Sequence, residues 1–213
     1  MALIEIDSLS KRYPFGSQAL KDLNLQVEEG KIVSIVGPFG CGKSTLLELL
    51  GGIREEYAGI IKIRGQNPKW ARVKRKIGYT FQNPTLLPWC NVIDNVLLPC
   101  KIDGRREDKK AWILLEMVGL NHLASRMPYE LSGGMQQLVG IVRSFMLDPD
   151  ILLLDEPFSS IDEINRSKIH QNLLRLHQKT NQTMVLVTHS ISEAVYLSDQ
   201  VVVLTPSPGQ VKR

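Results

Sequence analysis

A glycine-rich stretch near residue 40 has the spacing of a loop that cradles phosphate. Residues 37–44 read Gly-Pro-Phe-Gly-Cys-Gly-Lys-Ser and fit the pattern G-x-x-x-x-G-K-[ST]. An apolar segment, 31–36, leads in, and a helical pattern, 44–50, leads out. Backbone N–H groups then turn toward an anion, and the helix N-terminus adds its positive end. We expect Lys43 to reach the β- and γ-phosphates and Ser44 to hold Mg²⁺. The residues expected to contact a nucleotide here are Gly37, Pro38, Phe39, Gly40, Cys41, Gly42, Lys43, Ser44 and Thr45. The alternative, an ordinary glycine-rich turn, leaves Lys43 and Ser44 unexplained.

Two adjacent acids end a second apolar segment. Residues 151–154 read Ile-Leu-Leu-Leu and are followed by Asp155 and Glu156. Successive side chains of a strand point to opposite faces, so two acids at its end can serve different tasks. We expect Asp155 to hold Mg²⁺ through water and Glu156 to polarise an attacking water. The alternative is a solvated strand end. The presence of the glycine-rich stretch in the same chain favours the functional interpretation.

A histidine follows a third apolar segment. Residues 184–187 lead to Thr188 and then to His189, at the edge where parallel α/β sheets bind ligands. We expect His189 to contact the γ-phosphate. No sequence motif indicates a functional partner for the remaining histidines. We expect surface or packing roles for His122, His170 and His177.

The elements that must position these groups alternate between strand and helix patterns. Strands are predicted at 3–7, 23–27, 31–36, 60–63, 77–81, 151–154, 184–187 and 201–204. Helices are predicted at 44–50, 163–179 and 191–197. This alternation is typical of the α/β class with a parallel sheet.

The middle of the chain has helical patterns and no convincing strand. It is punctuated by Pro84, Pro88, Pro99 and Pro128. We therefore predict a single domain over residues 1–213. Residues 1–83 and 147–213 form its α/β core with a β subdomain, and residues 84–146 form an inserted helical subdomain.

Composition excludes several classes of protein. The chain has 213 residues, 26 basic and 22 acidic, a net charge of +4, and 43% apolar residues, which argues against disorder. No apolar run approaches the roughly 20 residues that span a bilayer, and no secretory leader is expected. Cys41, Cys90 and Cys100 form no CxxC, which disfavours zinc and suits a reducing cytosol. The thiol of Cys41, beside Lys43, is expected to react with alkylating reagents, more slowly with ATP bound.

Two basic runs, 69–76 and 105–110, raise the question of nucleic-acid binding. Apart from Trp70, no aromatic residue interleaves with them, so they lack the successive aromatic residues that a stacking platform requires. We interpret both runs as solvated faces and expect no nucleic-acid partner.

A further short motif, Leu131-Ser132-Gly133-Gly134-Met135, precedes a helical pattern. With the glycine-rich stretch before it and Asp155-Glu156-Pro157 after it, the chain resembles the ATP-binding-cassette (ABC) ATPases over nearly its whole length. The resemblance implies a P-loop NTPase core with a mixed or parallel sheet, an antiparallel β subdomain and an inserted helical subdomain. It also implies ATP and Mg²⁺ as cofactors and a homodimer with ATP at the interface. Ser132, Gly133 and Gly134 would contact the γ-phosphate of ATP held by the second subunit.

The resemblance carries further roles onto matching positions. Tyr13 is similar to the aromatic residue that stacks on adenine, and Gln82 to the glutamine that senses Mg²⁺ and touches the membrane partner. His189 matches the switch histidine, and residues 159–162 resemble the loop that joins two protomers. The implied catalytic residues are Glu156, His189, Lys43 and Gln82, and the implied metal ligands are Ser44, Gln82 and Asp155. The alternatives are a core aromatic for Tyr13 and a solvated amide for Gln82.

Within the family, residues 85–89, Thr-Leu-Leu-Pro-Trp, are similar to the ATPase subunits of nitrate, sulfonate and taurine uptake systems. This implies an importer subunit, peripheral on the cytoplasmic face of the membrane, with a separate permease and a solute-binding protein. The apolar side chains of Leu86, Leu87, Trp89, Val92 and Val96 are either subdomain core or a docking surface, and exposure of Trp89 would favour docking.

Three positions depart from the family pattern: Phe39, Met135 and Leu138 stand where serine, glutamine and arginine are usual. These departures bear on turnover and dimer strength more than on the fold. Rival functions are a soluble ABC ATPase not linked to transport, a small-molecule kinase and a non-hydrolysing nucleotide-binding regulatory module.

Overall fold

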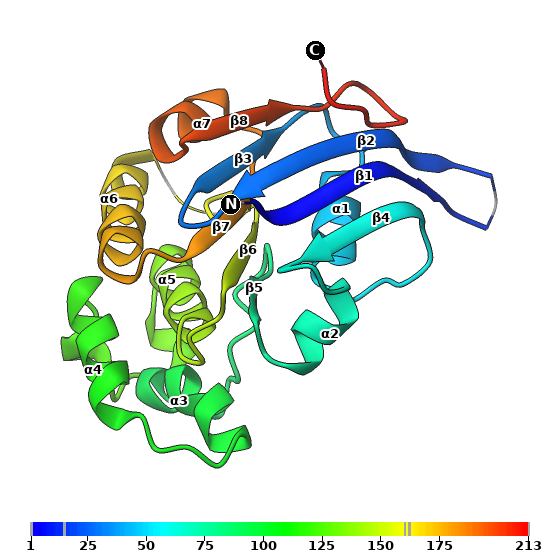
Figure 1. Ribbon diagram of the computed structural model, residues 1–213. Coiled ribbons are helices and arrows are strands. Elements are labelled where there is room, and N and C mark those ends of the chain that lie inside the picture. Colours follow the sequence, from blue (N-terminus) through cyan, green and yellow to red (C-terminus); the bar gives the residue numbers. More distant parts are fainter. Residues whose placement is uncertain (1, 15, 160, 162, 213) are drawn as a thin grey trace.

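The computed structural model describes residues 2–14, 16–159, 161 and 163–212. Its described residues form a five-stranded sheet, a three-stranded sheet and helices around both (Figure 1). The predicted protomer-joining loop is described at Ser159 and Ile161, whereas Ser160 and Asp162 lie outside the described residues.

The five-stranded sheet is parallel throughout. Its strands are β3 (Ile32–Val36), β5 (Ile77–Thr80), β6 (Ile151–Asp155), β7 (Thr183–Val187) and β8 (Gln200–Val203). They lie in the order β5-β6-β7-β3-β8, so β3 pairs with two strands from the end of the chain. The carboxyl ends of β3, β5, β6 and β7 therefore meet at one edge, where the sequence places its candidate chemistry.

The inner strands β3, β6 and β7 are buried on both faces of the sheet, which explains why they read as continuous apolar runs. Along β6, Ile151 and Leu153 pack into one hydrophobic core, while Leu152 and Leu154 pack into the other. The first core includes helix α1 (Lys43–Leu50) and the three-stranded sheet, and the second includes the remaining long helices. The parallel sheet is thus the middle of three layers.

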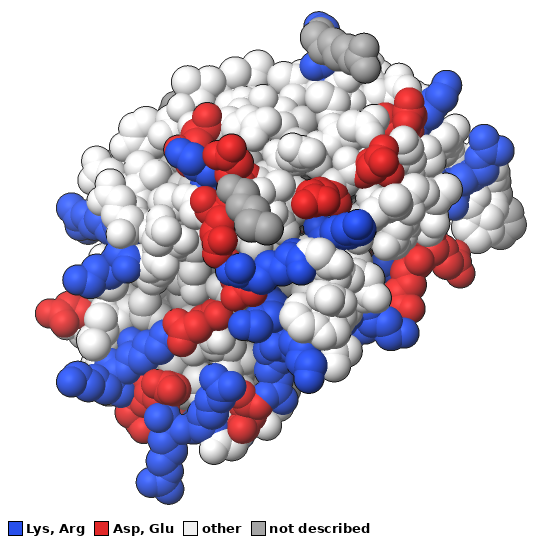
Figure 2. Space-filling model, in the orientation of Figure 1, with Lys and Arg blue, Asp and Glu red and all other residues white. Residues whose placement is uncertain are grey.

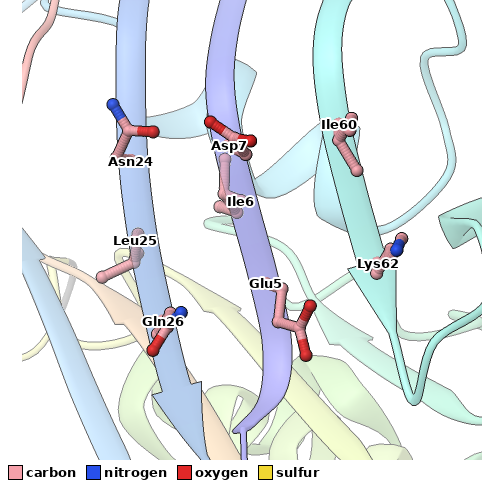
Figure 3. Close-up of a pocket in the computed structure, with 8 residues that line it drawn as sticks. All are labelled: Glu5, Ile6, Asp7, Asn24, Leu25, Gln26, Ile60 and Lys62. Atoms are coloured by element: carbon pink, nitrogen blue, oxygen red, sulfur yellow. The ribbon is translucent and has the colours of Figure 1, made fainter.

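The three-stranded sheet is antiparallel, with β1 (Ala2–Arg12) between β2 (Gln18–Glu28) and β4 (Ala58–Ile63). Its residues alternate between buried and exposed, as in a sheet with one face in water: Ile4 and Ile6 are buried. The outer face is hollowed by a cavity of about 540 Å³, where side chains of Glu5, Asp7, Asn24, Gln26, Ile60 and Lys62 project from all three strands (Figure 3).

Between β5 and β6 the chain is helical, in the region where the sequence predicts an inserted subdomain. Helices α3 (Val92–Ile102), α4 (Asp108–Met117) and α5 (Gly133–Ser144) gather at the lower left of Figure 1, with short 3-10 turns before α5. The side chains of Asn91 and Ser132 cap α3 and α5 by accepting hydrogen bonds from Asp94 N at 2.8 Å and Met135 N at 3.3 Å.

Two more helices complete the layers, α6 (Glu163–Thr180) after β6 and α7 (Ile191–Leu197) after β7. The predicted α/β class, with parallel and antiparallel sheets, is confirmed. Among the described residues, none of the helices combines the length and the apolar character that crossing a bilayer requires.

One helix was not predicted, α2 (Pro68–Val73). Its local signal is present, because Asn67 caps it by accepting from Trp70 N at 2.8 Å and Pro68 occupies the first turn. In the sequence this segment stands out only as a basic run, because six residues are too short to show an apolar helical periodicity.

The two basic runs are paired with acids. Lys69 lies 3.0 Å from Glu55, and Lys110 lies 2.7 Å from Asp148; Arg75 pairs with Asp103. Figure 2 shows basic and acidic side chains interleaved over the lower part of the molecule, where α2, α3 and α4 lie in Figure 1. These runs are therefore mixed-charge faces rather than uniformly positive ones.

Candidate active site

The glycine-rich loop connects β3 to α1 and surrounds the ammonium group of a lysine. Lys43 Nζ donates hydrogen bonds to the carbonyl oxygens of Gly37 and Pro38, both at 2.9 Å, and the side chain is buried. Gly42, which begins α1, has φ 99, and a Cβ there would lie 2.7 Å from the carbonyl oxygen of Ala19. Only glycine fits this position. The loop thus holds the ammonium group in place at the N-terminus of a helix, an arrangement that suits a polyphosphate.

Ser44 and Asp155 meet at the end of the loop. Ser44 Oγ donates to Asp155 Oδ1 at 3.1 Å, which joins the start of α1 to the end of β6. Burial raises the pKa of Asp155, and the nearby charges of Glu156 and Glu48 raise it further, while the hydrogen bond from Ser44 opposes them. A hydroxyl and a carboxylate are hard oxygen donors, and a carboxylate in this negative setting favours a cation. The pair therefore fits Mg²⁺.

Glu156 lies between two other predicted residues. Gln82 Nε2 donates to Glu156 Oε2 at 3.4 Å, and His189 Nδ1 lies 3.5 Å from the same oxygen. The three residues follow β5, β6 and β7, which are neighbours in the sheet. Glu156 has φ 44, a left-handed conformation that L-residues rarely adopt and that recurs at functional sites. The Glu156 carboxylate therefore lies within reach of an amide donor and an imidazole at the edge of the sheet.

A cavity of about 330 Å³ extends from this cluster toward Tyr13. The hydroxyls of Tyr13 and Thr45 share a hydrogen bond at 3.0 Å, and the charged groups of Lys11 and Arg54 lie 5.3 and 5.4 Å from the Tyr13 ring centre. The lining residues are Tyr13, Ser17, Gln18, Ala19, Phe39, Gly40, Gly42, Lys43, Ser44, Thr45, Glu156 and Ser207. The cavity thus has an aromatic end and a phosphate-loop end.

The C-terminal segment supplies a wall that the sequence did not reveal. Gly209 N donates to Ala19 O at 2.9 Å, and Ser207 Oγ donates to Gln18 O at 3.2 Å. A Cβ on Gly209 would lie 2.2 Å from the carbonyl oxygen of Cys41, so the segment packs directly on the phosphate loop. Only a Pro-Gly turn signal marks this stretch in the sequence, and no local pattern connects it to residue 41.

The expectation of a reactive Cys41 thiol is wrong. The side chain is fully buried and packs in the core beneath the loop, so only its backbone faces the site. By contrast, the side chain of Phe39 is fully exposed at the loop.

Ser132, Gly133 and Gly134 do not join this cluster within one copy of the chain. They line a separate cavity of about 420 Å³, together with Met135 and Leu138, and it shares no residue with the cavity at the phosphate loop. Ser132 and Gly133 are exposed at the N-terminus of α5.

Helix α5 is tied to the segment that carries Gln82. Gln137 Nε2 donates to Phe81 O at 3.2 Å, and Arg143 donates to Pro84 O and Thr85 O at 3.3 and 3.0 Å. Burial at this contact lowers the pKa of Arg143. The exposed start of α5 and the Gln82 segment are therefore linked by hydrogen bonds.

The apolar side chains of residues 86–96 fall into a buried group and an exposed group. Val92 and Val96 are fully buried in the core, whereas the side chain of Trp89 is 73% exposed. Asn95, fully buried, holds the loop between them: its side chain accepts from Leu87 N at 2.7 Å and donates to Cys90 O at 2.8 Å. The core interpretation holds for the valines, and the exposed tryptophan favours docking.

A parallel sheet with a phosphate loop after β3, a Ser–Asp pair and a Glu–Gln–His cluster at its carboxyl edge defines a P-loop nucleoside triphosphatase. The family model described as ABC transporter matches residues 20–159. The chain belongs to the ABC transporter family of ATP-binding proteins, and it is an ATPase of that type.

Named relatives show which members of the family this chain resembles. An aliphatic sulfonates import ATP-binding protein of Xanthomonas axonopodis is 44% identical over 202 residues, covering 92% of this chain and 79% of the relative. A taurine import ATP-binding protein of Jannaschia is 37% identical over 220 residues, covering 100% of this chain and 81% of the relative. A solved dimeric cassette in a post-hydrolysis state, bound to ADP and Pi, matches with a TM-score of 0.84 at 32% identity, over 99% of this chain and 97% of that one. The resemblance predicted from the motifs, to sulfonate- and taurine-type ATPases, is confirmed.

Proposed function

We propose that two copies of this chain enclose ATP between them and that hydrolysis drives solute import through a separate membrane permease. One observation supports the dimer: within one copy, the phosphate loop and Ser132–Gly134 line two different cavities. A second copy that brings its residues 132–134 to the phosphate loop completes the site. The dimeric state of the solved cassette supports this arrangement.

The residues of the site have separate roles in ATP binding and hydrolysis. Tyr13 stacks on adenine, and the loop amides with Lys43 hold the phosphates. Ser44, Asp155 and Gln82 hold Mg²⁺, which neutralises phosphate charge when bound. Glu156 orients the attacking water, and His189 offsets charge that develops on the γ-phosphate. The contacts of Glu156 with Gln82 and His189 support these roles.

The permease docks on the loop that presents Trp89. An exposed tryptophan on a loop held by the buried Asn95 offers an apolar anchor of fixed geometry. The hydrogen bonds from Gln137 and Arg143 connect this region to α5, so closure of the dimer and movement at the permease are coupled. Such docking places the chain at the cytoplasmic face of the membrane as a peripheral subunit.

The transported solute belongs to the class of small sulfonates, including taurine, and a solute-binding protein delivers it to the permease. The names of the relatives support this assignment. No side chain of the described residues is proposed to touch the solute, because the permease carries it.

Mixing two inactive variants tests the shared site. Lys43→Ala breaks the phosphate loop, and Ser132→Arg blocks the surface that reaches the other copy. Each variant alone forms only dimers with two broken sites, whereas a mixed dimer has one intact site. We expect equal amounts of the two to recover about a quarter of wild-type turnover when pairing is random and sites act independently. Phosphate release that stays at background in the mixture, with both variants folded, contradicts the proposal.

A further inference from the structure

A buried charged cluster lies behind the active site, between α6 and α7. Glu193 on α7 is 7% exposed, and its Oε2 accepts a hydrogen bond from the Thr188 hydroxyl at 2.5 Å. Its other oxygen, Oε1, lies 3.6 Å from Arg166 Nε and 3.7 Å from His170 Nε2, both on α6. Thr188 directly precedes His189, so the cluster touches the end of β7 where the site begins.

The Glu193 carboxylate of this cluster carries a charge. Burial alone would raise the pKa of Glu193, but the hydrogen bond from Thr188 and the nearby charge of Arg166 bring that pKa below its ordinary value. The carboxylate is therefore ionised at neutral pH, in a place where an unpaired charge would be costly.

Contacts from this cluster reach both sides of the active site. On one side, Thr188 Oγ1 also accepts from Ser190 N at 3.0 Å, which fixes the backbone on either side of His189. On the other side, Arg166 Nη2 donates to Ile161 O at 2.8 Å, in the segment that follows Glu156. The His170 ring meets the Phe158 ring edge-on, with centroids 4.7 Å apart.

Two donors of the cluster are not fully satisfied. Arg166 Nε and His170 Nε2 are buried and have no hydrogen-bond partner among the described residues. Glu193 Oε1 lies just beyond hydrogen-bond distance from both atoms. A shift of a few tenths of an ångström between α6 and α7 would close these contacts. Packing of two helices around polar groups that are nearly but not fully paired suits an element with two arrangements.

We propose that Glu193 is a positioning residue that links the segment after Glu156 to the backbone around His189. Through Arg166, a movement of Ile161 reaches Glu193, and through Thr188 it reaches His189. This inference rests on the proposed roles of Glu156 and His189 in ATP hydrolysis. It adds a buried residue that does not line the cavity at the phosphate loop and acts on the site through two loops.

Steady-state kinetics of Glu193→Gln test the proposal. Glutamine keeps the size and one acceptor for Thr188 but loses the charge that faces Arg166. We expect kcat to fall roughly tenfold while KM for ATP stays within about twofold, because His189 is misplaced while the phosphate loop is intact. Glu116→Gln, which removes the same charge from an exposed position of α4, serves as the control and should leave both constants unchanged.

A double variant separates positioning from simple helix packing. If Arg166 and Glu193 act as one unit, Arg166→Gln lowers kcat to a similar extent, and the double variant is no slower than either single one. Independent effects would multiply to about a hundredfold. The Arg166 side chain is about one-third exposed, so its replacement tests the link even if Glu193→Gln does not fold.

The outcomes distinguish this inference from the proposed function. A wild-type chain that neither hydrolyses ATP nor pairs with a second copy contradicts the proposed function. An active wild type with unchanged kcat in Glu193→Gln or Arg166→Gln overturns only the positioning role. Loss of ATP affinity and thermal stability in parallel with kcat, or multiplicative effects in the double variant, also overturns it, because helix packing alone then explains the cluster.

Discussion

The imidazole Nδ1 of His189 lies 3.5 Å from Oε2 of Glu156, although the two residues follow different strands. The register of the sheet causes this proximity. Asp155 of β6 is paired with Val187 of β7, and Glu156 N donates to Val187 O at 3.0 Å. A carboxylate and an imidazole that leave adjacent parallel strands at the same level must meet beyond the sheet edge. Their geometry is therefore a property of the sheet and not of a flexible loop.

Replacement of Glu156 by glutamine separates binding from hydrolysis. The amide keeps the size of the side chain but cannot accept the proton of an attacking water. We expect turnover to fall by at least about a hundredfold with ATP affinity retained and the dimer stabilised. Phosphate release and size-exclusion chromatography with ATP measure the two effects. Hydrolysis at the wild-type rate would remove Glu156 from its proposed role.

Replacement of Asp155 by asparagine should stabilise the chain without nucleotide and weaken its hold on Mg²⁺. Burial raises the pKa of Asp155 above its ordinary value of 3.8, so ionisation costs stability as pH rises through the raised pKa. Below the ordinary pKa the carboxyl is neutral in both states, and the advantage of asparagine disappears. We expect a higher urea midpoint for Asp155→Asn at pH 7, equal midpoints near pH 3, and at least about tenfold weaker Mg²⁺ binding. A lower urea midpoint at pH 7 would show that favourable interactions of the ionised Asp155 carboxylate outweigh the cost of its burial.

Gly209→Ala tests the contact between the C-terminal segment and the phosphate loop. A methyl group there collides with the backbone of Cys41, a contact that only movement of one segment relieves. We expect KM for ATP to rise about tenfold, since overpacking of this kind costs about 1–3 kcal/mol. Lys212→Ala, an exposed change in the same segment, is the control. Unchanged ATP affinity in Gly209→Ala would mean that the loop tolerates the displacement.

The site was largely predictable because its chemistry lies in short motifs at strand ends. Lys43, Asp155, Glu156 and His189 each follow or begin a recognisable element, and the parallel sheet brings strand ends together. Gln82 and Tyr13 also follow strands, but an amide or an aromatic ring there does not by itself indicate this chemistry, and their roles depended on resemblance to a family.

The parts that were missed depend on contacts between distant residues. Ser207 and Gly209 reach the phosphate loop only because β8 lies beside β3. Cys41 appeared reactive from its neighbours in the chain, and tertiary packing buries it. Glu193 and His170 carry no motif, and their significance arises from helix α6 crossing behind the site.

Thiol titration of the native protein should detect one reactive cysteine. Cys41 and Cys100 are fully buried, and burial raises the pKa of Cys100, whereas Cys90 is partly exposed. We expect one of the three thiols to react quickly in buffer, all three in urea, and none quickly in Cys90→Ser. A fast reaction of Cys41 that ATP slows would contradict its burial in the structure.

Trp89→Ala tests the docking surface. In the isolated subunit the side chain is exposed, so its loss should change basal ATPase activity less than about twofold. In the complete complex we expect weaker association and loss of stimulation by solute, because large aromatic side chains anchor interfaces. Trp112→Ala, at another exposed tryptophan, on α4, is the matched control. Equal behaviour of the two variants in the complex would place the permease contact elsewhere.

The central position of β3 has a consequence for biogenesis. This strand is made early, yet its neighbours β7 and β8 come from residues 183–187 and 200–203. During translation the strand that leads into the phosphate loop therefore waits for partners that leave the ribosome much later. A nascent chain released before residue 200 presents an unsealed sheet edge and no finished nucleotide site, which makes chaperone capture and proteolysis the expected fate of incomplete chains.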